Sequence, residues 1–270
     1  MVFGRDALHG TALITGASAG IGAELARVFA AHGHDLVLVA RRQDALEALA
    51  GHVEGKYGIR ATVIPADLSD PAAPAELFAA VQGGGLRVAI LVNNAGFGLA
   101  GEFGETDLDR ELAMIQVNVA ALTHLTKLFV RPMIQHHAGG ILNVASVAAL
   151  FPGPLRSVYY ATKAYVLSFT EALAEELRDS GVRVTALCPG PTATQFHAVS
   201  GGAAERFGSS RVADARAVAR FGYESMQDGV RVAIPGFQNK LAVQARRLAP
   251  RGVVTRLVRQ VQERRQRPTE

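Results

Sequence analysis

The chain of 270 residues is 49% hydrophobic, which is enough for a packed core and too much for a disordered protein. It contains a single cysteine, Cys188, so a disulfide framework and a zinc site built from several cysteines are both excluded. The net charge of +4 is unevenly distributed, because residues 241–270 hold eight Arg and only two Glu. The basic charge therefore belongs to the C-terminal segment, and we expect no binding of nucleic acid by the body of the protein.

The first ten residues are short and polar, without the apolar core of a signal peptide. No apolar run in the sequence approaches the length of a membrane span. A lone thiol is typical of a reducing compartment. Together these features predict a cytoplasmic protein.

Short β-branched or apolar runs alternate along the chain with Ala-rich stretches of helical character. The runs are nearly continuous, as is typical of strands buried on both faces of a parallel sheet. This alternation predicts an α/β, doubly wound Rossmann fold, in which helices flank a seven-stranded parallel sheet. The predicted strands are residues 11–15, 35–40, 60–65, 88–92, 140–145, 182–188 and 230–234, and the predicted helices are residues 20–32, 42–55, 74–82, 106–135 and 158–179.

The chain has no Pro/Ser-rich linker and no internal repeat, so residues 1–270 are expected to form a single Rossmann-fold domain. Two segments do not follow the alternation of strands and helices. Residues 191–230 contain Gly201-Gly202 and polar clusters, and we expect a mobile insertion that covers the substrate site as a lid. Residues 236–270 are expected to form a basic, helical C-terminal extension.

Apolar side chains recur at helical spacing within this extension and are surrounded by arginines. They are Val253, Val254, Leu257, Val258 and Val261. One interpretation is a helix that docks on its own domain or on a partner subunit. The other is a basic amphipathic helix that contacts an anionic membrane through residues 251–265, which would make the protein membrane-peripheral.

The first predicted strand runs into Thr15-Gly-Ala-Ser-Ala-Gly-Ile-Gly22 and then into a helix. Gly16 permits a tight turn, while Gly20 and Gly22 let backbone N–H groups and the helix N-terminus approach a pyrophosphate. The spacing G-x-x-x-G-x-G differs from the common dinucleotide fingerprint G-x-G-x-x-G. A glycine-rich turn without a ligand is the plainer alternative, but the flanking strand and helix favour a nucleotide site.

The end of the second predicted strand distinguishes NADP from NAD. An NAD site usually has an acidic residue there to hold the ribose 2′-hydroxyl. Here the chain reads Arg41-Arg42, and two guanidiniums suit a 2′-phosphate. Solvated arginines are the alternative, although cations are mildly unfavourable at a helix start. We therefore predict NADP(H), with Asp67-Leu68 at the adenine; a turn role for Asp67 is equally consistent with the sequence.

Tyr159 and Lys163 are four residues apart in a predicted helix and therefore share a face. A nearby ammonium favours the phenolate, which would lower the tyrosine pKa towards the range useful in general acid–base catalysis. Tyr160 is three residues from Lys163 and is also a candidate. Ser146 ends the fifth predicted strand, where its hydroxyl could donate to a substrate oxygen, although a capping role is favoured for this residue alone.

The combined motifs resemble the short-chain dehydrogenase/reductase family. The pattern Tyr-x-x-x-Lys of that family selects Tyr159 over Tyr160, and Ser146 precedes Tyr159 by thirteen residues, which fits the family's spacing. The similar residues are Thr15–Gly22, Asp67, Asn93-Asn94-Ala95-Gly96, Asn118, Ser146, Tyr159-x-x-x-Lys163 and Pro189-Gly-Pro-Thr-Ala-Thr194.

The resemblance implies a role for each catalytic residue. Tyr159 is similar to the proton donor or acceptor, and Lys163 to the residue that lowers its pKa and binds the nicotinamide ribose. Ser146 is similar to the group that orients the substrate carbonyl, and Asn118 to the residue that holds a water in a proton relay. The NADP(H) contacts are predicted at Gly16, Ser18, Ala19, Gly20, Ile21, Gly22, Arg41, Arg42, Asp67, Leu68, Asn94, Ala95, Gly96, Tyr159, Lys163, Pro189, Gly190, Thr192 and Thr194.

These observations predict an NADP(H)-dependent oxidoreductase that reduces a small-molecule ketone or aldehyde, or oxidises the alcohol. The expected substrate contacts are Ser146, Tyr159, Phe97, Phe151 and Phe196, and the aromatic residues favour a hydrophobic carbonyl compound. No set of convergent metal ligands can be assembled, so no metal is predicted. Two alternatives are a non-catalytic nucleotide-binding sensor and a membrane-associated protein that acts through the basic extension. The long helices resemble the family's dimerisation surface, which implies a homodimer or homotetramer.

Overall fold

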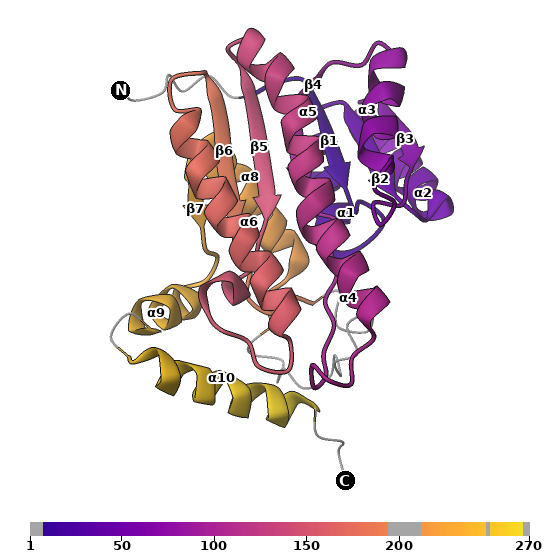
Figure 1. Ribbon diagram of the computed structural model, residues 1–270. Helices are drawn as coiled ribbons and strands as arrows, with labels where there is room; N and C mark the ends of the chain where they lie inside the picture. The colour runs from indigo at the N-terminus through magenta and orange to yellow at the C-terminus, as the bar shows by residue number, and fades with distance from the viewer. Residues whose placement is uncertain (1–7, 194–211, 247–248, 267–270) are drawn as a thin grey trace.

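The computed structural model describes residues 8–193, 212–246 and 249–266 of the chain. Its centre is a parallel sheet with the strand order β3-β2-β1-β4-β5-β6-β7 (Figure 1). The order reverses between β1 and β4, so the doubly wound, seven-stranded fold predicted from the sequence is confirmed. The strands are β1 (Thr11–Thr15), β2 (Leu36–Ala40), β3 (Ala61–Pro65), β4 (Val88–Asn93), β5 (Gly139–Val144), β6 (Val182–Leu187) and β7 (Val232–Ala233).

Helices cover both faces of the sheet. Successive side chains of a strand point to opposite faces, so Ile14 packs into one layer and Leu13 into the other. This burial on two sides explains the nearly continuous apolar runs of the strands. One layer contains α1 (Gly20–Ala31), α2 (Gln43–Tyr57) and α8 (Ala215–Gln227), and the other contains α3 (Ala73–Gly83), α5 (Leu122–Gln135) and α6 (Ser157–Glu176).

The predicted helix over residues 106–135 is formed but divided. α4 (Leu108–Ile115) leads into a π-helical turn, η1 (Gln116–Ala121), and then into α5. Single π-helical turns occur frequently at functional sites, and Asn118 lies in this one. By length and composition alone, Leu108–Gln135 is apolar enough to cross a membrane, contrary to the expectation from the sequence. Half of its most apolar window is buried inside the molecule, as in the core helix of a globular domain.

The C-terminal third differs most from the expected pattern. Part of the expected lid, residues 215–227, forms α8 instead, because apolar residues at helical spacing, such as Val218 and Met226, pack into the core beside α1. Residues 194–211 of the expected lid lie outside the described ranges. After the short β7 come α9 (Phe237–Ala245) and α10 (Arg251–Gln266). α10 lies across the end of the molecule towards which the strands point (Figure 1).

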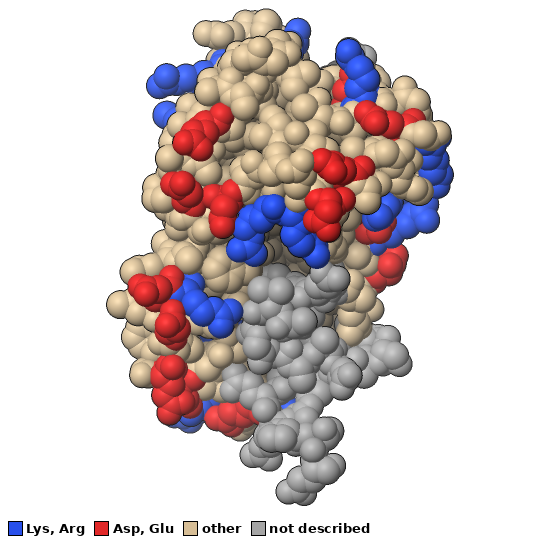
Figure 2. All heavy atoms as spheres, turned by 90° about the vertical axis from the view of Figure 1, so that its right-hand side faces the viewer, with Lys and Arg blue, Asp and Glu red and all other residues tan. Residues whose placement is uncertain are grey.

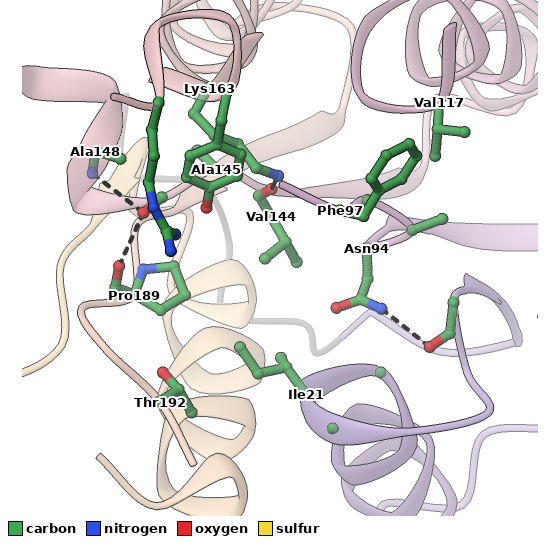
Figure 3. A pocket seen from close by; sticks show the side chains of 18 of the residues that line it. Ile21, Asn94, Phe97, Val117, Val144, Ala145, Ala148, Lys163, Pro189 and Thr192 are labelled. Carbon is green, nitrogen blue, oxygen red and sulfur yellow. Dashed lines mark hydrogen bonds between the residues drawn. The ribbon is translucent and has the colours of Figure 1, made fainter. Parts of the chain in front are cut away.

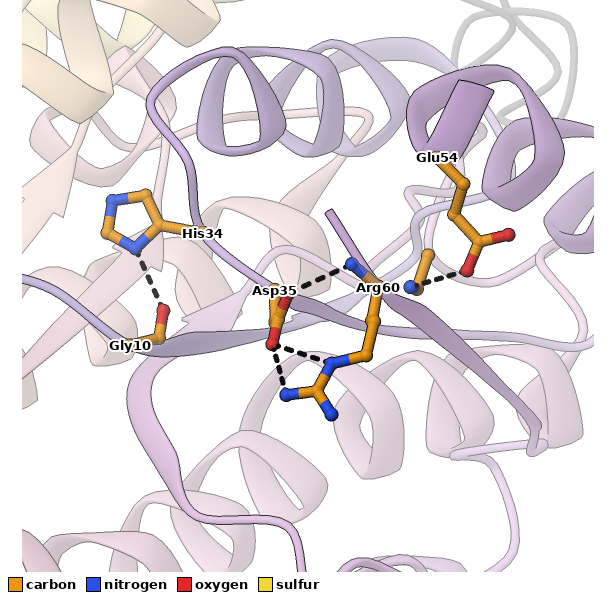
Figure 4. A network of polar contacts seen from close by, with 6 residues as sticks. Gly10, His34, Asp35, Glu54 and Arg60 are labelled. Carbon is orange, nitrogen blue, oxygen red and sulfur yellow. Dashed lines mark hydrogen bonds and ion pairs between the residues drawn. The ribbon is translucent and has the colours of Figure 1, made fainter. Parts of the chain in front are cut away.

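Polar contacts hold the beginnings of the first three strands together (Figure 4). The Arg60 guanidinium donates through Nε and Nη2 to Asp35 Oδ2, at 3.1 and 2.8 Å, and the Arg60 N–H donates to Asp35 Oδ1 at 2.9 Å. His34 Nδ1 lies 2.9 Å from the Gly10 carbonyl oxygen. These contacts fix the register of β1, β2 and β3 at the edge of the sheet opposite the strand ends discussed below.

A chain of buried polar side chains joins β4 and β5 to the helices that cover them. Asn93 Nδ2 donates to Thr126 Oγ1 on α5 at 3.0 Å and to Asn143 Oδ1 at 2.9 Å. Asn143 Nδ2 in turn donates to Thr170 Oγ1 on α6 at 2.9 Å. All four residues are buried. Because such groups are costly to leave unpaired, the network fixes how α5 and α6 sit on the sheet.

We predict that Asn143→Ala lowers the free energy of unfolding by about 2–4 kcal/mol, because it removes two buried hydrogen bonds and leaves Asn93 and Thr170 with one bond fewer each. The control is Gln43→Ala, which removes an exposed amide that bonds Glu47 on the surface of α2; about 0.5 kcal/mol or less is expected there. Urea unfolding followed by circular dichroism measures both values. Equal effects of the two substitutions would contradict the structural role of the network.

Candidate active site

A pocket of about 1030 Å³ lies at the carboxyl ends of the strands, where α/β folds bind their ligands (Figure 3). Loops that follow six of the strands form its wall, together with one face of α10. Asn118 lies beneath the wall, and Thr194 and Phe196 lie outside the described residues. The other predicted site residues line the pocket: Gly16, Ser18, Ala19, Gly20, Ile21, Gly22, Arg41, Arg42, Asp67, Leu68, Asn94, Ala95, Gly96, Phe97, Ser146, Phe151, Tyr159, Lys163, Pro189, Gly190 and Thr192.

The turn between β1 and α1 is pressed against the end of β4. Gly16 has a φ of +67°, and Asn94 Nδ2 donates to the Thr15 carbonyl oxygen at 2.9 Å. A Cβ atom on Gly22 would lie 2.2 Å from the Gly16 carbonyl oxygen and 2.4 Å from Asn94 Nδ2. The residue before α1 is Ala19, which has no side-chain oxygen to cap the helix. The first N–H groups of α1 are therefore available to an anion in the pocket.

The two arginines after β2 differ in what they contact. Arg42 Nη2 donates to the Ser18 carbonyl oxygen at 3.1 Å and to Ser18 Oγ at 3.3 Å, so it lies over the glycine-rich turn. Arg41 Nη1 lies 3.9 Å from Asp67 Oδ2, and both side chains are largely exposed. Asp67 also accepts the N–H and hydroxyl of Ser69, so it holds a turn as well as lining the pocket. On the face shown in Figure 2, basic side chains gather centrally between acidic ones.

Lys163 and Asn118 meet beneath the loop that follows β4. Lys163 is buried, and its Nζ donates to the Val144 carbonyl oxygen at 2.8 Å (Figure 3). Asn118 Nδ2 donates to the Phe97 carbonyl oxygen, Asn118 Oδ1 accepts the Phe97 N–H, and Nδ2 also donates to Thr162 Oγ1. Both groups of the Asn118 side chain are thus bonded within the protein. The side chain shapes the loop, and the contact of Asn118 with a water in a proton relay stays a prediction.

Burial dominates the electrostatics of the catalytic candidates. It raises the pKa of Tyr159 to about 12, although the Ser146 hydrogen bond and the Arg156 charge lower it. Burial also lowers the pKa of Lys163 to about 8. The sequence led us to expect that Lys163 would lower the tyrosine pKa; here Ser146 has the largest lowering effect on Tyr159. At neutral pH Tyr159 is a phenol and can give up a proton, and Lys163 is mostly protonated.

Ser146 is both a capping residue and part of the pocket wall. It is the N-cap of a short 3-10 helix, η2 (Val147–Leu150), and its Oγ accepts the Ala148 N–H at 3.1 Å. The same hydroxyl donates to the Pro189 carbonyl oxygen at 3.4 Å (Figure 3). The capping role favoured from the sequence is therefore present, and it fixes the hydroxyl at the carboxyl end of β5.

The sequence did not predict that the C-terminal helix forms part of the pocket. Gln262 on α10 is buried, and its Nε2 donates to the Tyr160 hydroxyl at 2.7 Å. Arg259 Nη2 lies 3.4 Å from Glu102 Oε1 on the opposite loop. The pocket-lining residues of α10 are Leu257, Val258, Val261 and Gln262. The apolar stripe read from the sequence was the signal, because its inner side faces the pocket; Val253, Leu257 and Val261 remain about half exposed.

We predict that Gly22→Ala abolishes or strongly weakens nucleotide binding, since the added methyl group collides with backbone and so displaces the turn. Gly51→Ala on α2 is the control, because nothing lies within 4 Å of a Cβ atom there. Fluorescence titration with NADPH measures the Kd, which should rise at least about tenfold for the first variant only. Unchanged affinity of the Gly22 variant would exclude this turn as the phosphate site.

Residues 10–202 match the family described as short chain dehydrogenase. A very-long-chain 3-oxoacyl-CoA reductase of Anas platyrhynchos is 31% identical over 195 residues, which are 70% of this chain and 62% of that protein, so this chain spans under two thirds of its relative. A sulfoacetaldehyde reductase of Chromohalobacter salexigens is 39% identical over 191 residues, which are 70% and 75% of the two chains.

Among solved structures, a short-chain dehydrogenase from Sphingobium yanoikuyae in complex with NADPH superimposes with a TM-score of 0.82 at 34% identity. The alignment covers 90% of this chain and 94% of that chain. The agreement extends over the seven-stranded sheet and its flanking helices. The chain belongs to the short-chain dehydrogenase family.

Proposed function

We propose that this protein is an NADP(H)-dependent oxidoreductase that reduces a ketone or aldehyde to an alcohol, or catalyses the reverse reaction. One observation carries the proposal: Tyr159, Lys163 and Ser146 line the same pocket as the glycine-rich turn after β1. A proton donor and a phosphate-binding turn in one cavity are the two parts that hydride transfer to a carbonyl group requires. The reductases among the related proteins support this reaction.

The pocket fits a nicotinamide dinucleotide in its size and donors. At Gly16 and Gly22 a side chain would collide with neighbouring atoms, so only glycine allows the close turn. The start of α1 offers backbone N–H groups to a pyrophosphate. Arg41 and Arg42 would bind the 2′-phosphate, and no carboxylate stands at the end of β2 to bind a free 2′-hydroxyl. The structure of a relative with bound NADPH supports the choice of NADP(H).

The bound nicotinamide supplies or accepts the hydride. Tyr159 donates its phenolic proton to the carbonyl oxygen as the alcohol forms, and accepts it in the reverse direction. Ser146 donates to the same oxygen and orients it. Lys163, one turn further along α6, adds a positive charge to the same pocket wall, although Ser146 and Arg156 are the groups that lower the Tyr159 pKa here. Because burial lowers the pKa of Lys163 to about 8, its charge is present at neutral pH and lost at higher pH.

The wall beyond Tyr159 is mostly apolar, which supports a hydrophobic body for the substrate. Phe97 and Phe151 contribute rings from two loops, and Leu257 and Val258 contribute aliphatic side chains from α10. Binding sites for small molecules commonly combine such apolar walls with a few polar groups that fix the orientation of the ligand. A relative that acts on very-long-chain 3-oxoacyl-CoA is compatible with this chemistry.

We predict that Tyr159→Phe lowers kcat for carbonyl reduction by about 10²–10⁴-fold, because the general acid is lost while the ring remains. The affinity for NADPH should stay within a few-fold of the wild type. Tyr165→Phe on the same helix is the control, since its exposed hydroxyl contacts Thr123 and lies outside the pocket wall. Consumption of NADPH with a panel of ketones and aldehydes gives the rates; full activity of the Tyr159 variant would refute the assignment.

We further predict that Arg41→Ala combined with Arg42→Ala lowers the preference for NADPH over NADH by about 10–100-fold, because charge-assisted hydrogen bonds to the 2′-phosphate are removed. The readout is the ratio of kcat/KM for the two cofactors. Arg87→Ala serves as the control, since Arg87 is exposed at the opposite edge of the sheet, just before β4. If the ratio is the same in the double variant and the wild type, these arginines do not select the cofactor.

A further inference from the structure

Arg156 lines the pocket at the start of α6 and has no assigned role in the reaction proposed above. Its Nε atom is buried and has no hydrogen-bond partner in the part of the chain that the structure describes. Within the described residues, no carboxylate lies in salt-bridge distance of its guanidinium. Other arginines of the chain do have such partners: Arg60 contacts Asp35 and Arg178 contacts Glu175, both at 2.8 Å.

The surroundings of Arg156 make an unpaired charge costly. Burial lowers the pKa of its guanidinium, while the neighbouring Tyr160 and Tyr159 raise it, so the charge lies close to both phenols. The one carboxylate among the described lining residues, Asp67, belongs to the nucleotide half and lies beside Arg41. A partly desolvated cation without a counter-ion is unfavourable. Proteins retain such a group mainly where a bound ligand supplies the opposite charge.

We propose that the substrate carries a carboxylate, or a similar oxyanion, close to the reacting carbonyl group, and that Arg156 binds it. The planar guanidinium can donate two parallel hydrogen bonds to a carboxylate. Because Arg156 is beside the phenol of Tyr159, the anion lies within a few bonds of the carbonyl carbon, as in a 2-oxo acid. The apolar wall of Phe97, Phe151 and Val258 takes the remainder of the molecule.

This inference rests on the proposed reductase activity for its kinetic consequences, but its binding consequence is independent of turnover. An alternative role for Arg156 is to act only on Tyr159, by favouring the phenolate. That role would affect charged and uncharged substrates to the same extent. A matched pair of substrates therefore separates the two roles.

The kinetic experiment compares 2-oxo-4-phenylbutanoate with its methyl ester, using NADPH as reductant. We expect the wild type to favour the acid by about tenfold to a hundredfold in kcat/KM, the range of one charge-assisted pair. Arg156→Met should bring this ratio to about one or below, mainly through the KM of the acid. Arg156→Lys keeps the charge but cannot donate two parallel hydrogen bonds, so its ratio should be intermediate. Arg87→Met should keep the wild-type ratio.

The binding experiment uses 4-phenylbutanoate and 4-phenylbutanamide, which lack the reacting carbonyl group, with the protein saturated with NADPH. The acid should bind the wild type at least about tenfold more tightly than the amide, and Arg156→Met should abolish that difference. A wild type that reduces the ester as well as the acid, or binds the amide as well as the acid, overturns the proposal. So does an equal loss for both substrates in Arg156→Met. An enzyme that binds the acid selectively but reduces no carbonyl compound contradicts the reductase function instead.

Discussion

The contact between the turn after β1 and the end of β4 determines the geometry of the pocket. Thr15 Oγ1 accepts hydrogen bonds from the backbone N–H groups of Asn94 and Ala95. The side-chain amide of Asn94 donates to the Thr15 carbonyl oxygen. These bonds bring two loops so close together that a Cβ atom on Gly22 has no room. The pocket exists because the chain reverses its winding direction between these two strands, and the bonds keep the two halves at a fixed separation.

Burial then sets the charge states on the catalytic side of the same gap. The pKa values of Tyr159 and Lys163 move in opposite directions for one reason, which is that the charged form of each is disfavoured away from water. Around neutral pH this leaves Tyr159 as a phenol and Lys163 as a mostly charged ammonium in the wall of the same pocket. That combination suits donation of a proton to a carbonyl oxygen, followed by stabilisation of the phenolate.

Local patterns were enough to predict the sheet and most of the pocket. Strands buried on both faces have a distinctive composition, and loops at the carboxyl ends of parallel strands meet whatever their distance along the chain. Thus Gly16 and Ser146 could be assigned to one end of the sheet from their positions after strands, whereas Asn94 was assigned through its resemblance to the family motif. The four-residue spacing of Tyr159 and Lys163 needed only helical periodicity.

The remaining features depend on contacts that no local pattern reports. The π-helical turn that contains Asn118 could not be predicted, because its residues resemble those of an ordinary helix. The polar residues of this segment suggested a lid, and α8 was not predicted. Its apolar residues become recognisable as a helix face only when the core against which they pack is known. The surroundings of Arg156 are likewise invisible in sequence, since the absence of a carboxylate partner among the described residues can be established only after folding.

The C-terminal extension illustrates the same limit and has a consequence for substrate choice. Its apolar stripe was compatible with a membrane or a protein surface, and in the structure its inner side faces the pocket, where Gln262 bonds to Tyr160. The wall facing the substrate is therefore made partly by the last described helix and partly by the loop before α6. Neither segment belongs to the turn after β1 or to a strand of the sheet, although the loop leads directly into α6 and Tyr159. In the proposed function, these two segments would select among carbonyl compounds, while the turn after β1 and the Tyr159–Lys163 pair would serve the hydride and proton transfer.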